Sequence, residues 1–163
     1  MATTPERRRL SLHLQGLVQG VGFRPFAHRL AQRLELQGWV RNGADGVELE
    51  LEGPQPELER FLAALLAAPP PRCRIDAVDQ RWGEAQGDVG AFRIGDPVER
   101  SAAVARNASA TAAISPDLAI CQTCLAELTD PGNRRFRYPF ISCTDCGPRY
   151  SLLRQLPFER PHT

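Results

Sequence analysis

The sequence predicts an α+β fold, with one antiparallel sheet covered by two helices, followed by a small cysteine-rich segment. Three observations support this prediction. Alternating apolar and polar residues mark several short strands, and two intervening stretches have the apolar spacing of amphipathic helices. Four of the five cysteines stand in two CxxC pairs near the C-terminal end. A chain of 163 residues has room for one domain with an appendage, or for two small domains.

The first half of the predicted order is strand, helix, strand, strand. Leucines alternate with polar residues over 10–14, which is the period of a half-buried strand. Apolar residues recur at helical spacing over 23–34, and Pro25 suits the first helical turn because its missing N–H costs nothing there. Residues 38–42 and 47–52 are predicted strands, joined as a hairpin by the turn-forming residues between them.

A second helix and two further strands complete the predicted domain. The helix begins after Pro54, places its apolar residues on one face, and ends at the prolines 69–71. Strands are expected over 75–82 and 91–94. The resulting order is βαββαβ with an extra strand, the ferredoxin-like arrangement of one antiparallel sheet with both helices on one face. We expect this domain to occupy residues 9–96 and a linker rich in Ala, Ser and Asn to follow over 97–115.

Composition excludes several classes of function. The formal net charge is +1, so no global field steers the chain toward nucleic acid or a membrane. Lysine is absent, which excludes a lysine nucleophile. We find no apolar run of about 20 residues and therefore expect no transmembrane helix, and the arginine-containing start has no apolar segment behind it, so we expect no secretory signal. These features predict a cytoplasmic protein, in which CxxC pairs bind metal more often than they form disulfides.

The stretch GLVQGVGFR, residues 16–24, connects the first predicted strand to the first predicted helix. Gly20 and Gly22 can adopt positive φ and allow the backbone to approach a ligand closely. The N–H groups at a helix start favour an anion, and Arg24 adds a guanidinium that matches a phosphate. The stretch fits neither the Walker A nor the dinucleotide-binding pattern. From the spacing alone, an anion-binding loop and a purely structural turn both remain open.

The two cysteine pairs, Cys121 with Cys124 and Cys143 with Cys146, are separated by 18 residues. This spacing is typical of a zinc site in which two turns aim four thiolates at one ion. We expect a closed, structural Zn²⁺ site within a finger over 116–151, whose folding energy comes largely from the metal because apolar residues are few. A redox disulfide pair and an iron site are the alternatives.

Residues 16–24 and 38–42 resemble the acylphosphatase family, whose pattern is G-x-V-Q-G-V-x-F-R followed by G-x-V-x-N. The resemblance implies that Arg24 and Asn42 are catalytic: Arg24 holds the phosphate and Asn42 orients the attacking water. It also implies hydrolysis that requires no metal. The implied phosphate-binding backbone N–H groups belong to Gln19, Gly20, Val21, Gly22, Phe23 and Arg24. Without the resemblance, Arg24 is an ordinary solvated arginine and Asn42 an ordinary turn residue.

Three other reactive side chains are expected to have no catalytic role. His28 lies off the apolar stripe of its helix, which predicts a surface position. His13 alternates with leucines and is expected on the solvent side of the sheet, and Cys73 is a lone thiol in a loop.

The segments SPDLAICQTCLAEL (115–128) and NRRFRYPFISCTDCGPRY (133–150) resemble the first finger of the HypF carbamoyltransferases, which mature [NiFe]-hydrogenases. Residues 152–163 resemble the spacer that follows this finger. The resemblance implies carbamoyl phosphate as substrate, with carbamate and phosphate as products. In the whole protein it implies transfer of the carbamoyl group to the C-terminal cysteine of a hydrogenase-maturation partner. We expect the chain to be a fragment that lacks the adenylating and transfer domains, so that only the hydrolytic step remains.

Two alternatives come from other functional classes. In the first alternative, the chain is a non-catalytic module that binds phosphate and docks a partner. In the second, the finger belongs to a nucleic-acid binder. The arginines at 134, 135 and 137 favour the second alternative, whereas the small net charge argues against it. We therefore expect no nucleic acid and no membrane among the partners.

Overall fold

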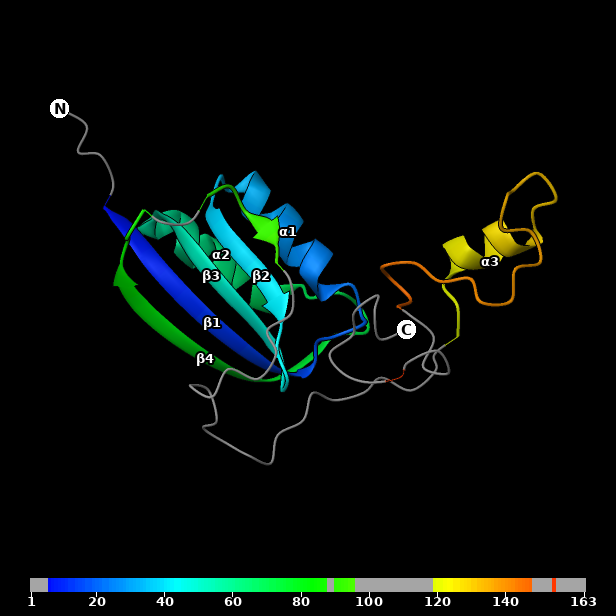
Figure 1. Cartoon of the computed structure of the whole chain (residues 1–163), viewed down its shortest axis with the longest axis horizontal. Helices are drawn as coiled ribbons and strands as arrows, with labels where there is room; N and C mark the ends of the chain where they lie inside the picture. Colours follow the sequence, from blue (N-terminus) through cyan, green and yellow to red (C-terminus); the bar gives the residue numbers. More distant parts are fainter. Residues whose placement is uncertain (1–5, 88–89, 96–118, 148–153, 155–163) are drawn as a thin grey trace.

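The computed structural model describes residues 6–87, 90–95, 119–147 and 154 (Figure 1). In chain order the elements are β1 (Arg7–Leu17), α1 (Phe23–Arg33), β2 (Gln37–Asn42), β3 (Val47–Pro54), α2 (Gln55–Ala67), β4 (Arg74–Glu84), β5 (Arg93–Ile94) and α3 (Gln122–Thr129). The predicted order of strands and helices is confirmed. The predicted linker over 97–115, and the predicted spacer over 152–163 except Arg154, lie outside the described residues.

The five strands form one sheet in the order β4-β1-β3-β2-β5. β1 pairs antiparallel with both β3 and β4, and β2 pairs antiparallel with β3. The sheet was expected to be antiparallel throughout, but β5 pairs parallel with β2, with Trp39 opposite Arg93. The difference arises because the chain reverses after β4 and crosses to the opposite edge of the sheet, where it meets β2 running in the same direction.

β1 is longer than the apolar alternation predicts. It begins at Arg7, three residues before the first leucine of the pattern. Arginine side chains interrupt the apolar pattern there, but the backbone ladder continues, with Arg9 paired to Glu52 on β3 and Gly83 on β4. The Arg9 guanidinium also forms an ion pair with the buried Glu52 carboxylate at 3.2 Å. A charged but paired extension of this kind cannot be seen in hydrophobic periodicity.

Both α1 and α2 cover the same face of the sheet (Figure 1). Every second residue of β1 and β3 points into this layer, as the alternation predicted. Full burial of a leucine or phenylalanine side chain contributes about 1.5–3 kcal/mol, so each side chain buried in this layer stabilises the domain. The fully buried core side chains include Leu10, Leu14, Phe23, Leu49, Leu51, Leu58, Phe61 and Leu65.

The end of β1 and the turn between β2 and β3 lie at the same end of the sheet. Leu14 pairs with Val47, and Val47 pairs with Asn42 across the hairpin. A Cβ added to Gly46 would lie 2.0 Å from the carbonyl oxygen of Leu14, so the turn is in direct backbone contact with β1. This packing brings the loop that follows β1 close to the end of β2. In the described part of the chain, no helix is long and apolar enough to span a bilayer.

Candidate functional site

The loop between β1 and α1 has the backbone conformation that its glycines predicted. Gly20 has φ 71° and Gly22 has φ 79°, both in the left-handed region. Gly22 is the cap residue of α1, and the Phe26 N–H donates to its carbonyl oxygen at 3.1 Å. A glycine cap has no side chain to occupy the N–H groups of the first turn, and that turn contains no acidic residue. The positive end of the α1 dipole is therefore suited to an external anion.

Gln19 joins this loop to the β2–β3 turn. Its side chain is 1% exposed. The Nε2 group donates hydrogen bonds to the carbonyl oxygens of Gly43 at 2.7 Å and Gly46 at 2.8 Å. Both N–H bonds of a buried amide are thereby used, which fixes the orientation of the side chain. The family resemblance implied only a backbone contribution from Gln19, and the signal for a side-chain role was the glutamine of the motif itself, a polar residue that directly follows Val18.

Asn42 and Arg24 lie on the two segments that Gln19 connects. Asn42 is the last residue of β2, is 1% exposed, and directly precedes Gly43. Arg24 is the second residue of α1 and is half-buried. The loop that carries Arg24 and the strand end that carries Asn42 are thus tied together at one end of the sheet. The arrangement provides a guanidinium and a helix start for an anion, with a buried amide nearby.

The structure also places the three side chains that were expected to have no catalytic role. His28 is half-buried, with its ring 6.0 Å from that of Phe92, so the expected surface position is wrong. The cause is β5, because the segment that leads into it packs over α1. His13 is also half-buried and contacts the Asp45 carboxylate at 3.1 Å. Burial raises the pKa of the Cys73 thiol to about 11.

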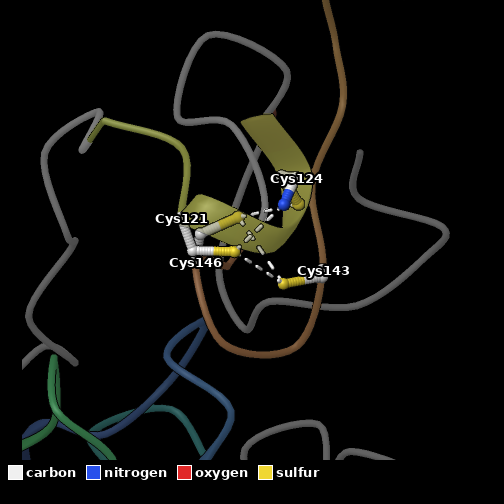
Figure 2. A group of neighbouring side chains, drawn as sticks. All are labelled: Cys121, Cys124, Cys143 and Cys146. Atoms are coloured by element: carbon white, nitrogen blue, oxygen red, sulfur yellow. Dashed lines mark hydrogen bonds between the residues drawn. The ribbon is translucent and has the colours of Figure 1, made fainter. Parts of the chain in front are cut away.

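The four cysteines of the two CxxC pairs converge on one point, as Figure 2 shows. Their sulfur atoms all lie within 4.8 Å of one another. Three separations are 3.6 Å for Cys121–Cys143, 3.7 Å for Cys124–Cys146 and 3.8 Å for Cys143–Cys146. A tetrahedral site with metal–sulfur bonds of about 2.3 Å requires sulfur separations of about 3.8 Å. The cluster therefore fits a single metal ion, and its sulfur atoms are too far apart for disulfides, whose S–S bond is about 2.05 Å.

Backbone N–H groups support the thiolate form of this cluster. The Cys124 N–H donates to Cys121 Sγ at 3.5 Å, and this hydrogen bond lowers the pKa of the Cys121 thiol. The Asp145 N–H donates to Cys143 Sγ at 3.3 Å. Among residues 119–147, the apolar core of the finger is small and centres on Cys124, Ile141 and Cys146. Such a small apolar core supplies little folding energy by itself, so an ion bound by the four cysteines would add to the stability of the segment.

Comparison with protein families gives two matches along the chain. The family model described as acylphosphatase matches residues 10–94. The model described as HypF finger matches residues 120–153. The first match covers all seven strands and helices of the sheet domain apart from the N-terminal end of β1, and the second contains all four clustered cysteines.

Individual relatives agree with these matches. The chain is 45% identical over 159 residues to carbamoyltransferase HypF2 of Cupriavidus necator, covering 98% of this chain and 19% of that protein. It is 44% identical over 92 residues to an acylphosphatase of Salinibacter ruber, covering 56% of this chain and 96% of that protein. A crystal structure of full-length HypF, in a phosphate- and nucleotide-bound form, superposes with a TM-score of 0.85 at 36% identity, covering 100% of this chain and 20% of that one.

The chain thus spans about a fifth of the length of the HypF proteins that it matches. Its sheet domain alone corresponds to nearly the whole of a single-domain acylphosphatase. The sheet domain is an enzyme domain of the acylphosphatase type, and a HypF finger follows it in the chain, which is similar over nearly its whole length to HypF carbamoyltransferases. The chain therefore belongs to the acylphosphatase family.

Proposed function

We propose that the chain hydrolyses an acyl phosphate at the site formed by residues 19–24 and Asn42, and that the substrate is carbamoyl phosphate. The observation that carries the proposal is the Gln19 side chain, which binds Gly43 and Gly46 and so holds the anion loop beside the end of β2. The choice of carbamoyl phosphate is supported by the name of the HypF relatives, which are carbamoyltransferases.

In this proposal the phosphate group occupies the loop at the start of α1. The backbone N–H groups of residues 19–24 and the Arg24 guanidinium donate hydrogen bonds to its oxygens. Because these donors are held in place before the substrate arrives, they stabilise the charge on the equatorial oxygens without reorganisation. The Asn42 amide orients the attacking water in line with the bond to be broken.

The reaction then needs no general acid. The water oxygen forms a bond to phosphorus, and the bond between phosphorus and the acyl oxygen breaks. The electron pair of that bond leaves with carbamate, which is a resonance-stabilised anion and requires no proton to depart. The proton released by the water is taken up by the phosphate product and the solvent. Positioning and charge stabilisation by Arg24, Asn42 and the loop therefore provide the catalysis.

We also propose that the clustered cysteines hold Zn²⁺ and that this ion is structural. Cys121, Cys124, Cys143 and Cys146 fill all four tetrahedral positions, so no position stays open for a substrate. We place the functional boundaries at 9–96 for the hydrolytic domain and 116–151 for the finger. In a full-length HypF protein, we propose that the carbamate passes on to the domains that transfer the carbamoyl group to the C-terminal cysteine of a hydrogenase-maturation partner.

The test is phosphate release from carbamoyl phosphate by the purified chain, with and without a metal chelator. We expect hydrolysis in both conditions and its loss in Arg24→Ala and Asn42→Ala. Arg29→Ala is the matched control, because Arg29 is an exposed arginine on the same helix. Comparison with acetyl phosphate measures the preference among acyl phosphates. Phosphate binding without any hydrolysis by the unmodified chain would instead favour a docking module.

A further inference from the structure

The second CxxC turn of the finger lies directly against the anion loop. A Cβ added to Gly147 would lie 1.8 Å from the carbonyl oxygen of Gly20. A Cβ added to Gly22 would lie 2.2 Å from the carbonyl oxygen of Thr144. Both separations are far too short for real atoms, so the two backbones approach as closely as glycine permits. In Figure 1 the chain just before residue 148 returns to the loop between β1 and α1.

Arg72 holds the finger to the sheet domain at the same place. It lies between α2 and β4 and is half-buried. Its Nη1 group donates a hydrogen bond to the carbonyl oxygen of Cys146 at 3.0 Å, and its Nη2 group donates to that of Ala119. One guanidinium therefore binds the backbone on both sides of the cysteine cluster, just before Cys121 and at Cys146 itself. The planar fork of arginine is suited to such a two-point contact.

The contact at Gly20 bears on the direction of an N–H group in the loop. The C=O and N–H of a trans peptide point in opposite directions. When the Gly20 carbonyl faces Gly147, the N–H of Val21 in the same peptide must point away from the finger. Val21 N–H is one of the proposed phosphate donors. The position of the finger turn therefore affects the orientation of a group that binds the anion.

We propose that the metal-bound turn 143–147 positions the anion loop, with Arg72 as the positioning residue that holds the turn in place. This inference rests on the proposed function of the loop. Cys143 and Cys146 are fixed by the ion, so Thr144 and Gly147 are fixed with them. Occupancy of the cysteine cluster thereby raises the affinity of residues 19–24 for a phosphate group. The role of the finger then extends beyond its own stability to the neighbouring site.

The test uses the full chain in the metal-loaded form and two variants from opposite sides of the contact. Arg72→Ala removes both hydrogen bonds to the finger, and Gly147→Ala forces the turn away from Gly20. The matched controls are Arg60→Ala, an exposed arginine on α2, and Gly132→Ala, a finger glycine with room for a Cβ. Metal content, binding of inorganic phosphate, and amide hydrogen exchange of residues 19–24 are measured for each protein.

We expect Arg72→Ala to retain its metal, to bind phosphate roughly five- to ten-fold more weakly, and to exchange the amides of residues 19–24 faster. The KM for the acyl phosphate should rise by a similar factor, with a smaller change in kcat. Arg72→Lys, which retains one donor group, should recover part of the affinity. Gly147→Ala and chelation of the metal should have the same effect on exchange and affinity, and the two controls should have none.

Unchanged phosphate affinity and unchanged exchange in metal-loaded Arg72→Ala would overturn the inference. The exchange measurement keeps the two proposals separate. If the unmodified chain fails to bind phosphate while metal and Arg72 still protect the amides of residues 19–24, the positioning role stands and the proposed function is wrong. If phosphate binds and is hydrolysed while every variant behaves as its control does, the proposed function stands and the positioning role is wrong.

Discussion

The side-chain amide of Gln19 donates a 2.7 Å hydrogen bond to the carbonyl oxygen of Gly43, the residue directly after Asn42. Through this bond, a loop that ends β1 and a turn that ends β2 become one rigid unit. The ladder through β3 aligns the strands that precede these two segments, and the Gln19 hydrogen bond extends this connection to the loop itself. Gln19 therefore links the loop that carries Arg24 directly to the turn that follows Asn42.

Replacement of Gln19 by alanine should damage both stability and activity. The change leaves the carbonyl oxygens of Gly43 and Gly46 without this donor in a buried place, which should lower the free energy of unfolding by about 1–3 kcal/mol. Chemical denaturation measures this loss, and phosphate release measures the accompanying loss of hydrolysis. Gln32→Ala is the control, because Gln32 is exposed on α1. Equal stability of the two variants would show that the Gln19 bonds do not support the fold.

Removal of the metal should unfold the finger but leave the sheet domain folded. In the described part of the finger, few side chains are buried beyond two of its own cysteines, whereas the sheet domain has an extensive core of its own. Thermal unfolding of a chelated sample should therefore retain the main transition, while amide protection disappears in residues 119–147. Metal analysis should give one ion per chain. A chelated finger that keeps its amide protection would contradict the role of the metal in folding.

Cys73 should react slowly with alkylating reagents in the metal-loaded protein. Burial raises its pKa to about 11, so little thiolate is present at pH 8. The same shift makes stability depend on pH. Below pH 9 the thiol is protonated in both states, but between pH 9 and about 11 the unfolded state loses the proton while the native state retains it. Unfolding free energy should fall through this window.

The control for this prediction is Cys73→Ala. The unfolding free energy of this variant should fall less above pH 9, because the Cys73 thiol is gone. Alkylation of the metal-loaded variant at pH 8 should consume no thiol, because the other four cysteines are metal-bound in this account. Rapid alkylation of Cys73 in the native protein at pH 8, at the rate of a free cysteine, would contradict its burial.

The sequence alone predicted the features that depend on local pattern. Gly20 and Gly22 stand where a strand must turn into a helix, and their positive φ follows from that position. The four cysteines were identified by spacing alone, because CxxC turns impose their own geometry. Catalytic roles for Arg24 and Asn42 came from a family resemblance and stay predictions.

Contacts between distant segments could not be predicted in this way. The bond from Gln19 to Gly43 and the bond from Arg72 to Cys146 join residues that no periodicity relates. The parallel pairing of β5 with β2 depends on where the chain crosses the sheet, which is a tertiary property. The partial burial of His28 follows from that same crossing. These contacts appear only when the packed fold is known.

The most direct test of the proposed site separates phosphate binding from turnover in Arg24→Ala and Asn42→Ala. Calorimetric titration with inorganic phosphate gives the affinity, and phosphate release from carbamoyl phosphate gives kcat and KM. We predict that Arg24→Ala loses both binding and hydrolysis, whereas Asn42→Ala still binds phosphate but loses about 10²-fold or more in kcat. Asn42→Ala that retains the kcat of the unmodified chain, or Arg24→Ala that binds phosphate with unchanged affinity, would contradict the proposed site.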